Sequence, residues 1–135
     1  MDVLVDTSIW SLALRRSNAS PHPATAELAE IIREGRALML GVIRQELLSG
    51  VRNPRQFESL RLHLRAFADI MIDADDYEQA ASFCNRCRSK GIQGGAIDFL
   101  ICAVAARRQV SIFTVDDDFE RYAKVLPLTL HHLRE

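Results

Sequence analysis

The chain has 135 residues, 48% of them hydrophobic and 26% charged, which is typical of one globular domain, 1–135, with a sizeable core. Seventeen lysines and arginines nearly balance eighteen acids and leave a formal charge of −1. This balance excludes an overall basic surface for nucleic acid and leaves only local patches.

The first ten residues have neither a basic leader nor a long apolar core, and no run approaches the roughly 18 apolar residues that span a bilayer. We therefore expect a soluble, cytoplasmic protein. The three cysteines are an odd number, and no second Cys/His pair completes a zinc site with Cys84 and Cys87. Reduced thiols packed on helices are expected, with a redox role as the alternative.

Short apolar strands alternate with helical patterns along the chain. The runs at 2–5 and 111–115 are apolar and β-branched, as buried parallel strands are. Weaker candidates lie at 37–40 and 70–72, and the C-terminal run LTLHHL is a candidate edge strand. Helices are predicted over Thr7–Arg15, Thr25–Glu34, Val42–Val51, Pro54–Phe67, Asp75–Lys90, Ala96–Arg108 and Asp118–Lys124. This order predicts an α/β fold: a mostly parallel sheet of four to five strands with helices on both faces.

Sites in such folds form at the carboxyl ends of the strands, and two acids are expected near that edge early in the chain. Asp6 directly follows the first strand, although an N-cap for the next helix also explains it. Glu46 lies on the helix after the second strand, where helical spacing places it beside Ile43 and Leu47 on the apolar side. No Lys or Arg lies three or four positions away, so a distant arginine is the remaining structural explanation.

Asp98 is the only charged residue from 91 to 106, in a helix that is apolar almost all the way round. An ionised carboxylate buried there is costly unless it is paired, hydrogen-bonded or bound to a metal. Gly94 and Gly95 suggest a simpler explanation, because they can start the helix and place Asp98 in its first turn, where the macrodipole favours an anion. Since the helix leads into the last long strand, its start is expected at the same sheet edge as Asp6.

Three aspartates follow the strand at 111–115 in FTVDDDFE. In an extended exit, Thr114, Asp116 and Asp118 share one side and Asp117 faces away. Acids are common in the first turn of a helix. Their position at the sheet edge is what favours a functional interpretation.

Several carboxylates at one edge repel one another, and a divalent cation would relieve that repulsion. Mg²⁺ prefers carboxylate oxygens and water, and Mn²⁺ accepts the same ligands. A zinc site would recruit His or Cys, and no histidine lies at the carboxyl end of a strand that leads into a helix. With no Ser/His/Asp or Cys/His arrangement evident, the site suits metal-assisted attack of water on a phosphodiester.

Taken together, these residues resemble the PIN-domain ribonucleases, in particular the VapC-type toxins of prokaryotic toxin–antitoxin pairs. The resemblance covers nearly the whole chain and rests on four segments in order: VLVDTSIW, IRQELLSG, GIQGGAIDFLICAVA and FTVDDDFE. It implies a three-layer α/β/α sandwich and a Mg²⁺- or Mn²⁺-dependent endoribonuclease that acts on RNA. It also implies a VapB-like antitoxin that occludes the site and a homodimer joined to antitoxin chains.

The resemblance implies roles for individual residues. Four acids match the family's metal-binding positions: Asp6, Glu46, Asp98 and Asp116. Asp118 is a further candidate at the fourth position, where family sequences vary. Thr114 or Thr7 is expected to orient a ligand or water through its hydroxyl. The carboxylates would fix one or two ions that activate water and stabilise the leaving oxygen.

Basic residues that could hold RNA cluster between the second and third strands: Arg44, Arg52, Arg55, Arg61 and Arg65. They could position phosphates without reading bases, but a solvated helix face is the simpler explanation, because Arg61 and Arg65 merely repeat at i, i+4. The same applies to Arg15 and Arg16. Trp10 could stack on a base, although its place on an amphipathic helix favours the core or an oligomer contact.

Two other functional classes remain open. One is a PIN-like module that has lost catalysis and only binds RNA or protein, and the presence of all four acids argues against it. The other is a phospho-accepting receiver-like domain, which is also a small α/β domain with an acidic Mg²⁺ pocket. The run IMIDAD could supply its aspartate, but aspartates follow the late strand where a receiver needs a lysine.

Overall fold

The strands form one parallel sheet. The computed structural model describes residues 1–14 and 22–134. Three strands form the sheet: β1 (Val3–Val5), β2 (Ala37–Leu38) and β3 (Ser111–Phe113). They pair in parallel in the order β2-β1-β3, and Val3 lies opposite both Ala37 and Ser111. Their carboxyl ends therefore meet at the same edge of the sheet.

Single parallel bridges extend the sheet on both sides, Met39 with Asp69 and Ile112 with Leu130. The candidate strand at 70–72 is reduced to the bridge at Asp69, beside which the Ile70 N–H donates to the Met39 carbonyl at 2.9 Å. The predicted C-terminal edge strand is reduced to the bridge at Leu130. Beyond it, the buried Glu27 carboxylate accepts hydrogen bonds from His131 at 2.9 Å and Arg134 at 2.9 Å.

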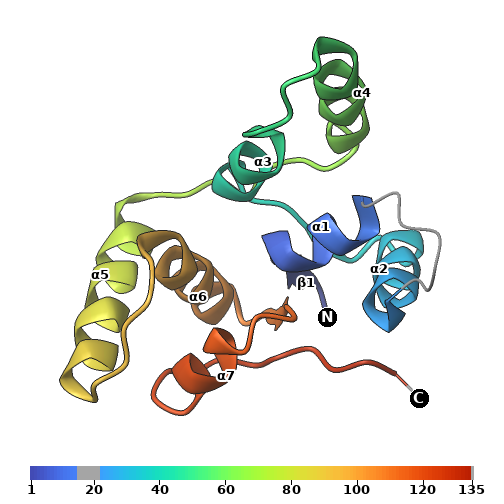
Figure 1. Ribbon diagram of the computed structural model, residues 1–135. Coiled ribbons are helices and arrows are strands. Elements are labelled where there is room, and N and C mark those ends of the chain that lie inside the picture. The colour runs from blue at the N-terminus through green and yellow to red at the C-terminus, as the bar shows by residue number, and fades with distance from the viewer. Residues whose placement is uncertain (15–21, 135) are drawn as a thin grey trace.

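Seven helices accompany the strands in the part of the chain that is described: α1 (Thr7–Leu14), α2 (Pro23–Arg33), α3 (Gly41–Leu48), α4 (Pro54–Leu64), α5 (Ala74–Ser89), α6 (Ala96–Arg108) and α7 (Asp118–Ala123). Each predicted helix is present, with ends moved by a few residues. The second begins early because Pro23 suits a first turn and the His22 side chain accepts the Ala24 N–H. Figure 1 places α5 and α6 on one side of the strands and α1 and α2 on the other. The predicted α/β/α fold is confirmed.

The centre of the core is α6, whose residues from Phe99 to Ala105 are all buried. It packs along α5 and against β3. Trp10 also belongs to the core, because its indole N–H donates to the Val5 carbonyl at 3.2 Å and its ring meets Phe67 edge-on. All three cysteines are free thiols, as predicted. Among the described helices, none is long and apolar enough to cross a membrane.

A buried ionic cluster fastens α5 to α6. Asp76 is fully buried and accepts hydrogen bonds from Arg107 at 2.7 Å and Arg108 at 2.8 Å. The Arg108 guanidinium holds the pKa of this carboxyl well below its usual range. Asp73 completes a capping box with Asp76. The aspartates of the run IMIDAD thus serve a helix start and an ion-pair network, which removes the support for a receiver-like phosphorylation site.

Replacing Asp76 with alanine leaves two arginines without their shared partner, so we expect a loss of about 3 kcal/mol in the free energy of unfolding. Urea denaturation measures this loss. Because folding lowers the Asp76 pKa, the wild-type advantage is present above pH 3.8 and declines as the pH falls below that value. Asp75→Ala is the matched control, since Asp75 is exposed and its ion pair with Arg107 is long, at 3.6 Å. Equal losses in both variants would contradict this account.

Candidate metal centre

The first site residue, Asp6, is buried directly after β1. Its Oδ2 atom accepts hydrogen bonds from the hydroxyls of Ser8 at 2.8 Å and Thr114 at 2.8 Å. Its backbone N–H donates to the Phe113 carbonyl at 2.9 Å. Asp6 is therefore fixed between the ends of two neighbouring strands, and its side chain does more than cap α1.

Asp98 lies in the first turn of α6, as predicted from Gly94 and Gly95. Its Oδ2 atom accepts a hydrogen bond from the Tyr122 hydroxyl at 2.8 Å. Burial raises the pKa of the Asp98 carboxyl, the Tyr122 hydrogen bond lowers it in part, and the nearby carboxylates of Asp6, Asp116 and Asp118 raise it further. The position of Asp98 at the start of the helix does not offset these effects, because the net shift of its pKa is upward.

The chain after β3 brings two more acids to the same place. Thr114, Asp116 and Asp118 are half-buried, whereas Val115 and Asp117 are exposed, so the predicted alternation is confirmed. A chain of local hydrogen bonds fixes this exit: the Thr114 hydroxyl accepts the Asp116 N–H at 3.0 Å, and Asp116 Oδ1 accepts the Asp118 N–H at 2.9 Å. Asp118 also forms an ion pair with Arg121.

Carboxylate oxygens of Asp98, Asp116 and Asp118 all lie within 4.8 Å of one another. Among the described residues, no Lys or Arg pairs with Asp98, Asp116 or the adjoining Asp6, so the negative charge at this edge is largely uncompensated. Oxygen donors and excess negative charge are what a hard divalent cation requires. The residues present therefore fit a metal such as Mg²⁺, with Asp116 freer to bind it than Asp118, which Arg121 already engages.

Glu46 lies apart from this cluster. It is exposed on α3, so the prediction that it lies on the apolar side of its helix is wrong. Glu46 lies one helical turn after the buried Ile43, on the same side of α3. Its side chain is nevertheless exposed because it lines an open hollow that no other element of the described chain fills. Its Oε1 atom accepts a hydrogen bond from the Thr7 hydroxyl at 2.7 Å. The hollow beside it, about 340 Å³, is also lined by Ile97, the residue before Asp98.

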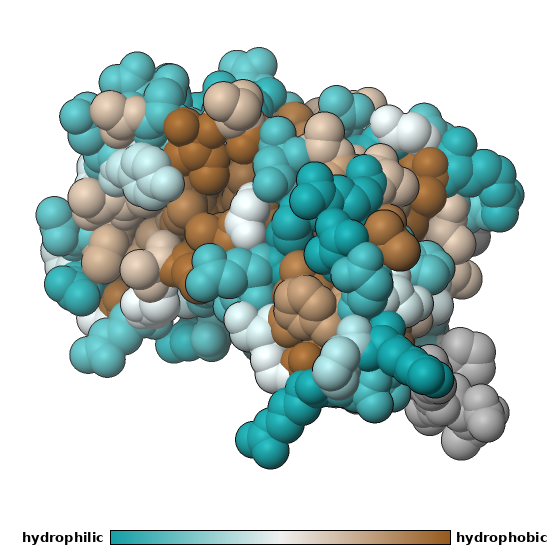
Figure 2. Space-filling model, turned by 90° about the horizontal axis from the view of Figure 1, so that it is seen from above, coloured by the Kyte–Doolittle hydropathy of each residue, from teal (hydrophilic) through white to brown (hydrophobic). Residues whose placement is uncertain are grey.

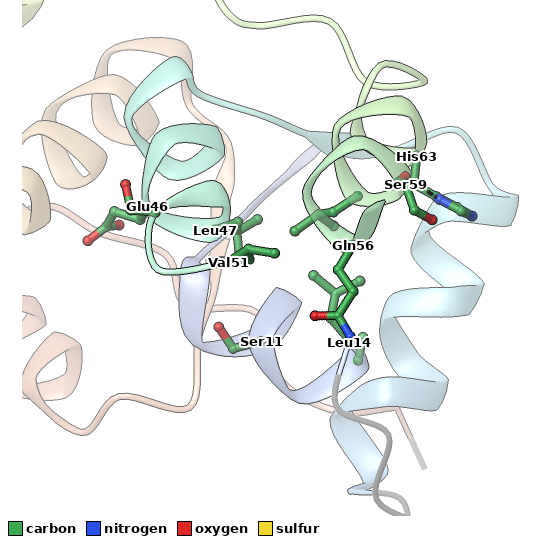
Figure 3. A pocket seen from close by; sticks show the side chains of 11 residues that line it. Ser11, Leu14, Glu46, Leu47, Val51, Gln56, Ser59 and His63 are labelled. Carbon is green, nitrogen blue, oxygen red and sulfur yellow. Dashed lines mark hydrogen bonds between the residues drawn. The ribbon is translucent and has the colours of Figure 1, made fainter. Parts of the chain in front are cut away.

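Glu46 also borders a larger groove of about 760 Å³ between α1, α3 and α4. Figure 3 shows Glu46 at one end of the side chains that line it and His63 at the other. Leu14, Leu47 and Val51 contribute apolar surface between them. The face of the molecule that carries α4 mixes apolar and polar side chains (Figure 2).

The arginines that cluster in the sequence have different partners in the structure. Arg44 donates to Asp69 Oδ1 and to the carbonyls of Leu64 and Phe67, so it braces the chain after α4. Arg61 pairs with Glu58. In residues 1–14 and 22–134, three exposed arginines of the predicted set have no acidic partner: Arg52, Arg55 and Arg65. Arg15 and Arg16 lie outside the described residues.

Sequence reasoning missed two residues that shape the site, Ser8 and Tyr122. Ser8 bonds Asp6 and also accepts the Val115 N–H at 3.1 Å, which joins α1 to the exit of β3. Its position two residues after Asp6 could have indicated that its hydroxyl bonds the Asp6 carboxylate. Nothing in the local pattern pointed to Tyr122, because its partner Asp98 is 24 residues away and on another helix.

A family profile for the PIN domain matches residues 3–125. The chain belongs to the PIN domain family. The match spans every strand and helix of the fold, and it includes all the acids described above. The comparison with curated protein sequences finds no match.

Solved structures share the fold of this PIN domain. FitAcB from Neisseria gonorrhoeae superposes with a TM-score of 0.76 and 22% identity over 96% of each chain. VapBC2 from Rickettsia felis, bound to a DNA fragment from its promoter, gives a TM-score of 0.77 and 17% identity over 97% of this chain and 98% of that one. VapBC-1 from nontypeable Haemophilus influenzae gives 0.75 and 15% over 100% of both chains. At these identities the similarity establishes the fold alone.

Asp98→Asn removes a charge that burial and three neighbouring acids disfavour. Because folding raises the Asp98 pKa, the wild type loses stability as the pH rises above 3.8. We therefore expect the variant, without divalent cations, to have the higher Tm at pH 7 and a shrinking advantage toward pH 4. Thermal denaturation in EDTA at both pH values measures it. A lower Tm for the variant at pH 7 would instead support the helix-start explanation.

Proposed function

We propose that this PIN domain is a divalent-cation-dependent endoribonuclease that hydrolyses RNA phosphodiester bonds with water. The observation that carries the proposal is the group of Asp98, Asp116 and Asp118 beside the buried Asp6. An inactive binding module has no need to hold these mutually repelling acids together. Family membership supports the same conclusion.

In this proposal, Asp98, Asp116 and Asp6 hold Mg²⁺ or Mn²⁺, with Asp118 as a further ligand and Glu46 at the margin. Such an ion supplies positive charge at the reacting phosphate and makes a water molecule more acidic. The hydroxyls of the chain orient the acids: Thr114 and Ser8 donate to Asp6, and Thr7 donates to Glu46. Arg121 restrains Asp118 at the start of α7.

The RNA backbone would be held by the three arginines of the predicted set that have no acidic partner among the described residues: Arg52, Arg55 and Arg65. Arg52 lies just before α4 and Arg55 in its first turn, and Gln56, Ser59 and His63 of this helix line the groove that reaches Glu46. Guanidinium groups in such positions hold phosphates without reading bases. This arrangement would guide a single strand toward the acids.

We further propose that the protein is the toxin of a VapBC-type pair, controlled by a VapB-like antitoxin, and that it forms a homodimer. Structures of similar fold include those of FitAcB and VapBC2. They also include a toxin–antitoxin complex from Klebsiella pneumoniae and a member of the VapBC family of toxin–antitoxin systems from Mycobacterium tuberculosis. The groove offers apolar side chains along its length and the Glu46 carboxylate at one end (Figure 3). It suits a partner segment with apolar side chains and a basic residue that reaches the acids and blocks them.

RNA cleavage by purified, antitoxin-free protein tests the enzymatic proposal. We expect cleavage of a mixed RNA pool with Mg²⁺ or Mn²⁺ and none with EDTA. Asp98→Asn and Asp116→Asn should each lose more than about 100-fold in rate, since removing even an outer partner of a metal ligand costs 10–100-fold. Asp117→Asn is the matched control, because Asp117 is exposed and outside the cluster. Cleavage that survives EDTA, or equal activity in all three variants, would contradict the proposal.

The salt dependence of RNA binding tests the proposed role of the arginines. Arg52→Ala and Arg55→Ala should each weaken binding of a catalytically inactive Asp98→Asn protein to single-stranded RNA. Each should also lower the slope of log K against log salt by about 0.7, the contribution of one phosphate contact. Arg61→Ala serves as control, because Glu58 already pairs with Arg61. An unchanged slope in the first two variants would remove these residues from the RNA path.

A further inference from the structure

Tyr122 is the one described residue whose side chain bonds Asp98. It is fully buried on α7, and its ring packs against Phe99 at a centroid distance of 5.1 Å and Phe119 at 5.3 Å. The hydroxyl donates to Asp98 Oδ2 at 2.8 Å. Asp98 Oδ1 has no hydrogen-bond partner in the part of the chain that is described, so one oxygen of the carboxylate is held and the other is left for a ligand.

Gly94 provides the space for this hydroxyl. A Cβ atom at position 94 would lie 2.2 Å from the Tyr122 oxygen and 2.7 Å from Cζ, which no real packing allows. The backbone does not require glycine there, because positive φ angles occur at Gly35, Gly50 and Gly91 instead. The neighbouring Gly95 has nothing within 4 Å of its ideal Cβ position. Glycine at position 94 is therefore explained by the space that the Tyr122 side chain occupies.

Tyr122 also connects the two elements that carry the acids. It lies four residues after Asp118, one turn along α7, whereas Asp98 belongs to the first turn of α6. The Tyr122–Asp98 hydrogen bond thus fixes the start of α6 against α7.

We propose that Tyr122 is a positioning residue for the metal centre, and that Gly94 is required because it accommodates the Tyr122 hydroxyl. The inference rests on the proposed function, since it concerns the same acids. A donated hydrogen bond sets the orientation of a ligating carboxylate, and losing such an outer partner typically weakens metal affinity 10–100-fold. Tyr122 itself touches neither metal nor RNA in this role.

Mn²⁺ titration of metal-free protein, by calorimetry and by electron paramagnetic resonance of free Mn²⁺, tests the inference. We expect Tyr122→Phe and Gly94→Ala each to raise the Mn²⁺ Kd about tenfold. Tyr77→Phe, an exposed tyrosine on α5, and Gly95→Ala, beside open space, are the matched controls and should bind like the wild type. In cleavage assays, the Mn²⁺ concentration for half-maximal rate should rise with the Kd while the KM for RNA stays unchanged.

The double variant separates this role from general packing. If both changes act through the same hydrogen bond, Gly94→Ala costs less Mn²⁺ affinity in the Tyr122→Phe background than in the wild type. The contacts of the new Cβ with Cζ and Cε1 of the ring, at 2.7 and 2.9 Å, are the same in both backgrounds. Wild-type affinity in Tyr122→Phe, or equal effects of Gly94→Ala and Gly95→Ala, overturns the inference and leaves the proposed nuclease standing. A wild type that binds no Mn²⁺ overturns the metal centre and this inference together. The glycine pair decides the question even if Tyr122→Phe fails to fold.

Discussion

The mutual repulsion of carboxylates at one edge of the sheet is the constraint on which the site depends. Asp98 is held in a partly buried place where burial and three other acids all disfavour its charge. The core packing does not require an acid there, since the residues that follow it on the helix, Phe99 to Ala105, are all apolar and buried. The fold tolerates this cost because the buried core of β1 and α6 and the ion pairs between α5 and α6 stabilise it independently of these acids.

The packed strands and helices thus hold the acids at one charged edge of the molecule. β1 is fully buried between β2 and β3, and the ion pairs of Asp76 with Arg107 and Arg108 fasten α5 to the far end of α6. Hydroxyl groups of Ser8, Thr114 and Tyr122 then aim individual carboxylate oxygens. A neutral donor suits this purpose, because it orients a carboxylate without cancelling the charge that a cation would need.

Part of this arrangement could be predicted from the sequence. Periodicity placed Asp6, Asp98 and Asp116 at one edge, because each lies directly beside a strand or helix boundary whose direction the chain order fixes. Glu46 was misjudged, since helical spacing identifies a face of the helix but not whether another element covers it. Tyr122 and Gly94 could not be predicted, because their contact joins two helices and depends on tertiary packing at the scale of one atom. The ion pairs of Arg44 and Asp76 were missed for the same reason.

In the function proposed above, this edge of the sheet binds a divalent cation. Anomalous diffraction from crystals soaked in Mn²⁺ tests it most directly, because the signal locates the ion without assuming its ligands. We expect a peak among Asp98, Asp116 and Asp6 that is absent in Asp98→Asn crystals treated in the same way. A map with no peak at this edge, or with a peak that survives in the variant, would contradict it.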